Sequence, residues 1–309
     1  MAESNKLYKY LNRDIEVPEG LPMLAAISGF TDAGSSMQQV SQHILANLDH
    51  VTLVAFDNDQ LLDYRSRRPV MFFEQDHISD YQPPSLGVFL VWDEVGNPFL
   101  FLNGYEPDFQ WDAFADSVIE LFEYFNVKDM TWLHSIPFPI PHTRPVGVTV
   151  SGNQQSVIDK YSEWRPRTQV PGNVLHLLEF QLTRAGYSST GFVLLVPHYI
   201  SDSEYPQAAV TAFELISSHL SLVFPTDDLR DEGVAFIRRL NQEIAEKPEL
   251  ARMIEGLEKS FQSEKSANGM GAVKPRQNEV PDAEEIAAEL EGYLAQHQKN
   301  KSENEEDED

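Results

Sequence analysis

The chain has 309 residues, enough for one large domain and a smaller one. Hydrophobic residues account for 41% of the sequence and aromatic residues for 11%, so the bulk of the chain can bury a substantial core and lacks the composition of a disordered protein. The absence of cysteine excludes disulfides, thiolate catalysis and cysteine-ligated zinc, and the net charge of −26 argues against general binding to DNA or RNA, which relies on phosphate neutralisation.

The stretch from Pro22 to Leu48 has the pattern of a strand, a turn and a helix. Met23–Ile27 is a short apolar run between a proline and a glycine, which predicts a buried strand. The turn Gly29–Gly34 contains two glycines, and apolar residues at helical spacing predict a helix from Ser35. Such a turn favours an anion, although its spacing matches neither GxGxxG nor a Walker motif. Two interpretations of this turn are equally open: it is a loop that binds a ligand, or it is a tight turn that serves packing alone.

Four short strands are predicted after this unit, at residues 51–56, 70–74, 86–92 and 99–103. Gly96-Asn97-Pro98 separates the last two, which predicts an antiparallel hairpin. The loop of residues 63–69 contains three arginines, whose guanidinium groups suit a carboxylate or a phosphate. Ion pairs with nearby acids are the alternative, and they are the favoured interpretation for Arg67.

Three further helices and three further strands complete the predicted body. The helices are residues 111–125, 173–184 and 206–220, and the strands are residues 130–136, 146–150 and 191–196. Four prolines between Pro137 and Pro145 argue against a helix or a central strand, so the chain that carries His142 and Arg144 is expected to be extended and stiff. Residues 153–170 predict a mobile loop with a short helix.

The predicted elements divide the chain into three parts. Residues 1–225 predict an α/β body, and residues 226–264 predict a helical appendage of two consecutive helices. Residues 265–309 predict a linker, an amphipathic helix at 282–298 and a disordered acidic tail. The polar N-terminus does not resemble a signal peptide, and no apolar run is long enough for a membrane span, so we expect a cytoplasmic protein with no membrane contact.

Polar side chains follow most of the predicted sheet strands. The residues concerned are Asp32, Glu106, His142, Arg144 and His198. If their strands are parallel, these groups meet at one edge of the sheet and form a pocket for an anion or a sugar with acid/base groups beside it. A lone histidine is more often structural than catalytic, so both interpretations stay open. No HExxH, GxSxG or paired metal-ligand spacing is present, and neither a metal nor a cofactor is predicted.

Five sequence boxes, taken together and in this order, resemble the family named for the second proteasome assembly chaperone, and its actinobacterial branch in particular. The boxes are GFTDAG at 29–34, LDYRSRRP at 62–69, GYEPD at 104–108, PHTRP at 141–145 and VPHY at 196–199. The resemblance runs from about residue 20 to about residue 262.

This resemblance implies a three-layer α/β/α sandwich, akin to the nucleoside phosphorylase and nucleosidase fold, with a C-terminal helical region. It also implies self-association, including as trimers. Eukaryotic members of the family help to assemble proteasome α rings. Members that dock on proteasomes often use a C-terminal hydrophobic-tyrosine-any tripeptide, whereas this chain ends in Asp307-Glu308-Asp309, so that mode of docking is not expected.

Two hypotheses for function follow. The first, which we favour, is a homo-oligomeric scaffold for protein interaction or assembly, with aromatic residues expected in exposed loops (Tyr81, Trp92 and Tyr105) as interface seeds. The second is an enzyme or binding protein for a small anionic, phosphorylated or nucleoside-like ligand. Its candidate catalytic residues are His142, His198, Asp32 and Glu106. Its candidate ligand-binding residues are Gly29, Thr31, Gly34, Arg65, Arg68, Arg144 and Tyr199.

Overall fold

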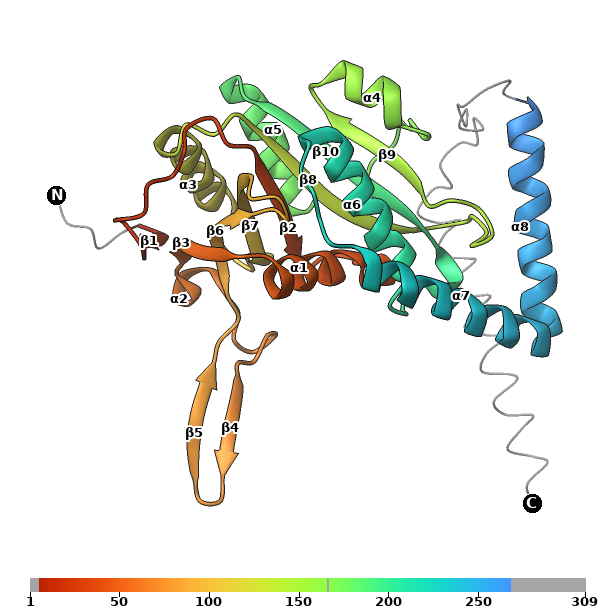
Figure 1. The fold of residues 1–309 in the computed structure, drawn as a ribbon, viewed down its shortest axis with the longest axis horizontal. Helices are drawn as coiled ribbons and strands as arrows, with labels where there is room; N and C mark the ends of the chain where they lie inside the picture. Colours follow the sequence, from red (N-terminus) through yellow and green to blue (C-terminus); the bar gives the residue numbers. More distant parts are fainter. Residues whose placement is uncertain (1–5, 166, 268–309) are drawn as a thin grey trace. The chain divides into compact units, whose positions relative to one another are not determined.

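The computed structural model describes residues 6–165 and 167–267. Its centre is an eight-stranded sheet with the strand order β1-β3-β6-β7-β2-β8-β10-β9 (Figure 1). In chain order the strands are β1 (Tyr8–Tyr10), β2 (Met23–Ser28), β3 (His50–Phe56), β6 (Leu86–Trp92), β7 (Pro98–Tyr105), β8 (Asp129–Phe138), β9 (Gly147–Gly152) and β10 (Ser188–Pro197). Neighbours β7, β2, β8 and β10 run parallel, so their carboxyl ends share one edge of the sheet.

Helices cover both faces of this sheet. They are α1 (Ser36–Asn47), α2 (Asn58–Leu61), α3 (Trp111–Tyr124), α4 (Gln155–Tyr161), α5 (Val174–Ala185), α6 (Pro206–Leu220), α7 (Asp227–Glu246) and α8 (Pro248–Ala267). Helices α1 and α6 bury their apolar stripes on one face, and α3 and α5 bury theirs on the other. Because alternate side chains of a strand point to opposite faces, each central strand contributes to both cores. The predicted three-layer α/β/α sandwich is confirmed.

Several local sequence signals produce the elements that they predict. The Asn173 side chain accepts a hydrogen bond from the His176 N–H at 2.9 Å and caps α5, which ends at Gly186 in the left-handed region with φ of 90°. Pro206 lies in the first turn of α6, where its missing N–H costs nothing. The turn around Gly96 joins β6 and β7 as an antiparallel pair.

Three other expectations need correction. Residues 77–82 form an unpredicted strand, β5, which pairs with β4 (Val70–Glu74) as a separate two-stranded hairpin. Trp92 and Tyr105 do not lie in exposed loops: they end β6 and β7, and Tyr105 is only 4% exposed. Strand β8 also continues through Pro137, because there it pairs with β10 alone.

The two predicted C-terminal helices are present as α7 and α8. Both helices fall in the same compact unit as the sheet. Leu229 and Leu240 of α7 belong to the core cluster that lies between the sheet and α6. The predicted helix at 282–298 and the acidic tail lie outside the described residues. No helix in the described part of the chain combines the length and the apolar character that a membrane span requires.

At Gly191 the core has no room for a larger residue. The Trp132 ring lies directly over Gly191, where an added Cβ would come within 2.2 Å of the ring. Both residues belong to neighbouring strands of the core, so neither can move aside easily. We expect Gly191→Ala to lower the free energy of unfolding by about 1–3 kcal/mol through overpacking, measured by urea denaturation. In Gly256→Ala, where no atom lies within 4 Å of the new Cβ, helix propensity should instead raise stability slightly. Equal stability of the two variants would contradict this account.

Candidate functional site

The carboxylate of Asp32 occupies the anion position that the sequence predicts at the start of α1. Its two oxygens accept hydrogen bonds from the N–H groups of Met37 at 2.8 Å and Gln38 at 3.0 Å. The Ser135 hydroxyl, at the end of β8, donates a third bond at 3.0 Å. The helix dipole and these donors are therefore already paired with a negative charge of the chain itself.

The carboxylate of Glu106 accepts a hydrogen bond at the start of α5, on the opposite face of the sheet, as Asp32 does at the start of α1. Its Oε1 accepts a hydrogen bond from the Val174 N–H at 2.8 Å. Burial raises the pKa of Glu106, and the Val174 N–H offsets part of that shift. The Glu106 side chain packs against Gly29, where an added Cβ would lie 2.4 Å from the Glu106 Cβ. Gly29 therefore makes room for this carboxylate.

Two histidines, His134 and His176, meet near the amino end of α5, and the sequence analysis did not select either of them. Burial, together with a smaller effect of the neighbouring His176, lowers the pKa of His134 to about 4. Burial also lowers the pKa of His176. The two rings are 6.2 Å apart, and Phe30 stacks on His134 at 6.2 Å. Both imidazoles are therefore neutral near pH 7. His134 was missed because it lies within a buried strand, not after one.

The glycine turn of residues 29–34 is held in an uncommon backbone conformation. Thr31, Gly34 and Ser35 have φ angles of 35°, 71° and 47°. Gly34 is fixed by backbone bonds, because its N–H donates to the Ser201 carbonyl at 2.7 Å and its carbonyl accepts from the Tyr205 N–H at 2.9 Å. Left-handed non-glycine residues persist only where the surroundings hold them, and they are frequent at functional sites. The turn is therefore a rigid part of this edge.

The other predicted site residues form a second group, against the C-terminal helices. The Tyr199 hydroxyl is 2.7 Å from both the backbone N and the Nδ1 of His142, whose Nε2 is 3.1 Å from Asn241 Oδ1 on α7. Arg144 donates two hydrogen bonds to Glu258 on α8, at 2.7 and 3.1 Å. Arg144 therefore pairs with Glu258 and not with the strand-end carboxylates Asp32 and Glu106. Its guanidinium instead joins the proline-rich loop to α8.

Of the remaining candidates, His198 adjoins the second group through Tyr199, and the loop arginines lie apart from both groups. His198 begins the short helix η2 (His198–Ile200), and its ring meets Tyr199 edge-on at 5.5 Å. Arg65 and Arg68 are exposed in their loop. Arg67 forms the expected ion pair, with 3.2 Å between its Nη2 and Asp108 Oδ1. The structure thus brings Asp32 and Glu106 to one sheet edge but does not gather all the predicted residues in one cleft.

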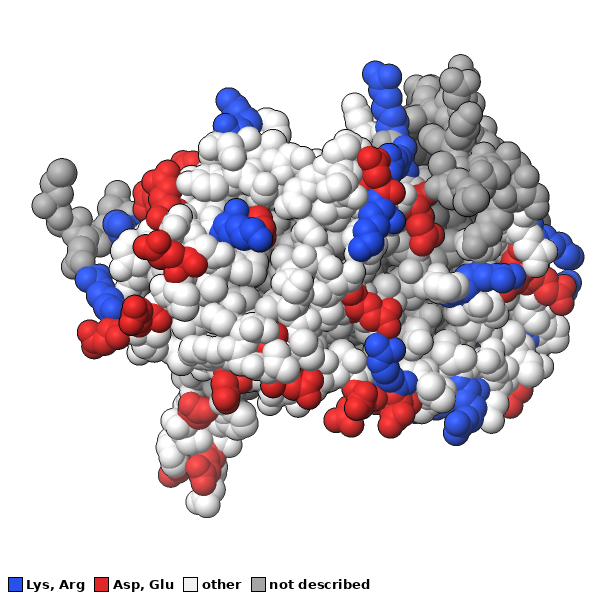
Figure 2. Space-filling model, turned by 45° about the horizontal axis from the view of Figure 1, so that its top comes forward, with Lys and Arg blue, Asp and Glu red and all other residues white. Residues whose placement is uncertain are grey.

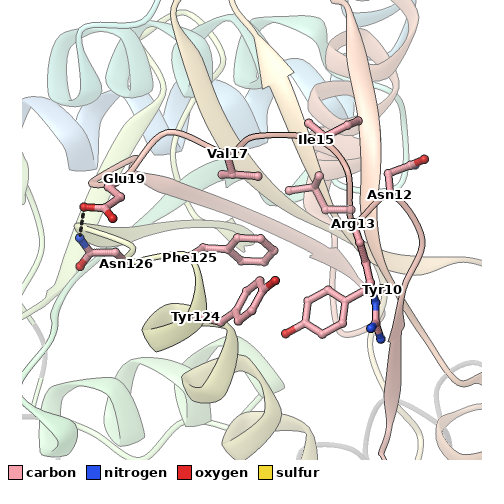
Figure 3. Close-up of a pocket in the computed structure, with 10 residues that line it drawn as sticks. Tyr10, Asn12, Arg13, Ile15, Val17, Glu19, Tyr124, Phe125 and Asn126 are labelled. Atoms are coloured by element: carbon pink, nitrogen blue, oxygen red, sulfur yellow. Dashed lines mark hydrogen bonds between the residues drawn. The ribbon is translucent and has the colours of Figure 1, made fainter.

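Two well-formed pockets lie away from these groups. One, of about 340 Å³, lies beneath the N-terminal segment and is shown in Figure 3, where Tyr10, Tyr124 and Phe125 form its aromatic wall. Another, of about 650 Å³, lies at the base of the β4–β5 hairpin and is lined by Tyr64, Tyr81 and others. Neither is lined by Asp32 or Glu106. Within residues 6–165 and 167–267 no group of three or more histidine or acidic side chains could hold a metal ion.

Comparison with known proteins decides the family. The model of the PAC2 family matches residues 26–244, more than half of the chain. The chain belongs to the PAC2 family. The family resemblance found in the sequence boxes is therefore confirmed. Among curated proteins no match is found.

Solved structures agree with this PAC2 assignment. A Corynebacterium glutamicum protein of unknown function is 33% identical, with a TM-score of 0.80 over 85% of this chain and 99% of its own. The Mycobacterium tuberculosis protein Rv2714, also of unknown function, is 30% identical, with a TM-score of 0.79 over 87% of this chain and 92% of its own. The proteasome-assembly chaperone homologue Rv2125 of the same species is 24% identical, with a TM-score of 0.69 over 76% of this chain and 100% of its own. At this identity the match supports the fold and nothing more.

Proposed function

We propose that this PAC2 protein acts as a homo-oligomeric scaffold for protein interaction or assembly, and that the β4–β5 hairpin is its main contact element. The hairpin stands away from the central sheet (Figure 1). Every residue from 70 to 82 is exposed, although several are apolar. The exposed apolar side chains are Val70, Met71, Phe72, Phe73, Ile78 and Tyr81, with exposed fractions of 48–68%.

Exposing these apolar side chains to water is energetically unfavourable. A two-stranded hairpin with no sheet behind it is marginally stable alone, and contiguous exposed apolar side chains usually mark an interface. At the base of the hairpin, Asn58 donates to the Pro84 carbonyl at 2.7 Å and accepts from the Tyr105 hydroxyl at 2.6 Å. The hairpin also carries acidic side chains and no lysine or arginine (Figure 2). A second copy of the chain, or another protein, would cover the apolar residues.

The polar groups at the sheet edge support the same proposal indirectly. Asp32 and Glu106 cap helices, and Arg144 is paired with Glu258. These contacts occupy the groups that an anion-binding pocket would use. The structurally similar protein Rv2125, a proteasome-assembly chaperone homologue, adds support for an assembly role, and a protein partner besides the chain itself is part of the proposal.

Sedimentation tests the proposal through the hairpin. The wild type is expected to sediment as an oligomer at micromolar concentration. The double variant Phe72→Ser/Phe73→Ser is expected to sediment as a monomer, because both rings are exposed in the isolated chain and would make their contacts with a partner copy. Phe109→Ser, which removes a ring that is 52% exposed elsewhere, is the matched control and should leave the oligomer intact. A wild type that is monomeric throughout would reject the proposal.

The small-ligand alternative rests on one observation: the neutral His134 and His176 meet near the amino end of α5, whose Val174 N–H donates to Glu106, at the edge where α/β sheets bind ligands. Thermal melting with a panel of phosphates, sugars and nucleosides separates the two functions. The scaffold proposal expects no ligand in the panel to raise the melting temperature. A reproducible rise that is lost in His134→Gln would favour a ligand site instead.

A further inference from the structure

Four buried polar atoms that have no hydrogen-bond partner among residues 6–165 and 167–267 come from one small region. They are Asp129 Oδ1, Thr131 Oγ1, Thr190 Oγ1 and His219 Nε2. Both threonines are fully buried, and Asp129 is 8% exposed. An isolated buried polar atom loses its bond to water and gains nothing in return, so native proteins contain few of them. Four in one region call for a ligand.

The strand register places three of these atoms on one surface. In the parallel pair β8 and β10, Thr131 lies opposite Thr190, and Asp129 is two residues before Thr131. Side chains two residues apart on a strand point to the same face. Leu133 and Phe192, two residues further along each strand, pack in the core on the α6 side. Asp129, Thr131 and Thr190 therefore face α6.

The last turn of α6 supplies the fourth atom. The His219 ring meets Phe192 edge-on at 5.6 Å, which places it over the same two strands. Burial lowers the pKa of His219, and Asp129 offsets part of that shift. Burial raises the pKa of Asp129, and His219 in turn offsets part of it. This mutual effect requires the two side chains to be close.

The hydrogen-bonding capacities of the four groups match those of one water molecule. A carboxylate oxygen and an unprotonated imidazole nitrogen accept, and two threonine hydroxyls can donate. A water molecule donates two bonds and accepts two. Lys128 Nζ, 3.9 Å from Asp129 Oδ2, already provides a positive charge, so a neutral ligand fits better than a metal ion. We propose that the amino ends of β8 and β10 and the last turn of α6 hold an internal water that bridges Asp129, Thr131, Thr190 and His219.

This water has a structural role that the side chains cannot fill alone. It ties the end of α6 to the centre of the sheet through polar contacts, at the opposite end of β8 from Ser135 and Asp32. Internal waters of this kind usually make about three hydrogen bonds to groups that would otherwise be unsatisfied. Removing one bridging hydroxyl should therefore weaken the attachment of α6.

Isosteric substitution tests the proposal. Thr131→Val and Thr190→Val should each lower the melting temperature by about 2–4 °C, because the water loses one hydrogen-bond partner and is then held less firmly against the other three groups. The double variant should cost less than the sum of the single variants, since both hydroxyls bond to the same molecule. Thr131→Ser, which keeps the hydroxyl, should retain most of the stability.

Ser189→Ala is the matched control. The Ser189 Oγ is also buried without a partner, but it lies on the opposite face of β10, away from the other four atoms. Its removal should leave the melting temperature unchanged or raise it. A high-resolution crystal structure of the wild type should show an ordered water in contact with at least three of the four groups. Valine variants as stable as the wild type, no ordered water, or a metal ion at this position would each overturn the proposal.

Discussion

Replacing Asp93 with alanine is expected to lower the free energy of unfolding by about 3–5 kcal/mol. The Asp93 side chain is buried, and its carboxylate accepts four hydrogen bonds. Oδ1 accepts from the N–H groups of Val95 at 3.1 Å and Asn97 at 2.7 Å. Oδ2 accepts from the Asn97 side chain at 3.0 Å and the Val223 N–H at 2.9 Å. Alanine would leave these donors without a partner.

The contacts of Asp93 also explain why the loss should be large. They join the β6–β7 turn to the segment between α6 and α7, two parts of the chain that are far apart in sequence. Burial on its own would raise the pKa of Asp93, but the Val223 N–H and the donors from Asn97 and Val95 together lower it. A lowered folded-state pKa means that this stabilisation is present above the unfolded pKa and is lost as the pH falls through the folded value.

Urea denaturation at pH 7 measures this effect. Glu94→Ala is the matched control, because the neighbouring Glu94 side chain is exposed and should contribute less than about 0.5 kcal/mol. Asp93→Asn should fall between the two, since an amide keeps one acceptor oxygen and places donors where acceptors are needed. If Asp93→Ala and Glu94→Ala have the same urea midpoint, the carboxylate does not hold the two segments together.

Acid should destabilise the protein through His134. Burial lowers the pKa of His134 to about 4 from the ordinary histidine value of 6.5. The unfolded chain therefore binds a proton that the folded chain rejects, so stability falls as the pH drops from about 6.5 towards 4. A shift of this size corresponds to on the order of 3 kcal/mol at the acid end of that window. His176, whose pKa burial also lowers, acts in the same direction.

The buried acids in this region act in the opposite direction. Burial raises the pKa values of Glu106 and Glu179, and a raised carboxyl pKa favours the folded state at low pH. The contribution of His134 is therefore measured as a difference, between the wild type and a variant, in how steeply the urea midpoint changes with pH. Urea midpoints between pH 7 and pH 4 should fall less steeply in His134→Gln than in the wild type. His77→Gln, at an exposed hairpin histidine, should keep the wild-type slope. Equal slopes in all three proteins would show that His134 takes up its proton freely when folded.

The sequence is informative where local chemistry decides the structure. The cap at Asn173, the stop at Gly186 and the proline at the start of α6 each act within one or two turns, and the structure has all three. The buried sheet strands also follow from apolar patterns, because parallel strands buried on both faces have continuous apolar runs. The three-layer sandwich, by contrast, was expected from the family resemblance. The β5 strand was missed for the opposite reason: residues 77–82 have no buried face and therefore no clear pattern of burial.

The site is harder to predict because its contacts are distant in sequence. Strand topology correctly suggests that Asp32 and Glu106 reach one edge, but their partners lie on two different helices. The pairing of Arg144 with Glu258 spans 114 residues, and nothing near Arg144 indicates it. His134 and His176 gain their altered pKa values only from burial in the folded state. Such features depend on packing, which a pattern of residue types does not specify.

Hydrogen exchange of the hairpin amides tests the central claim most directly. In the full-length protein at high concentration, amides of residues 70–82 should be protected, because a partner copy covers the hairpin. On dilution below the dissociation constant this protection should disappear, while the amides of β2 and β8 remain protected by the sheet core. Exchange of the hairpin amides at the rate of an unprotected peptide, at every concentration at which the sheet is intact, would contradict the scaffold account.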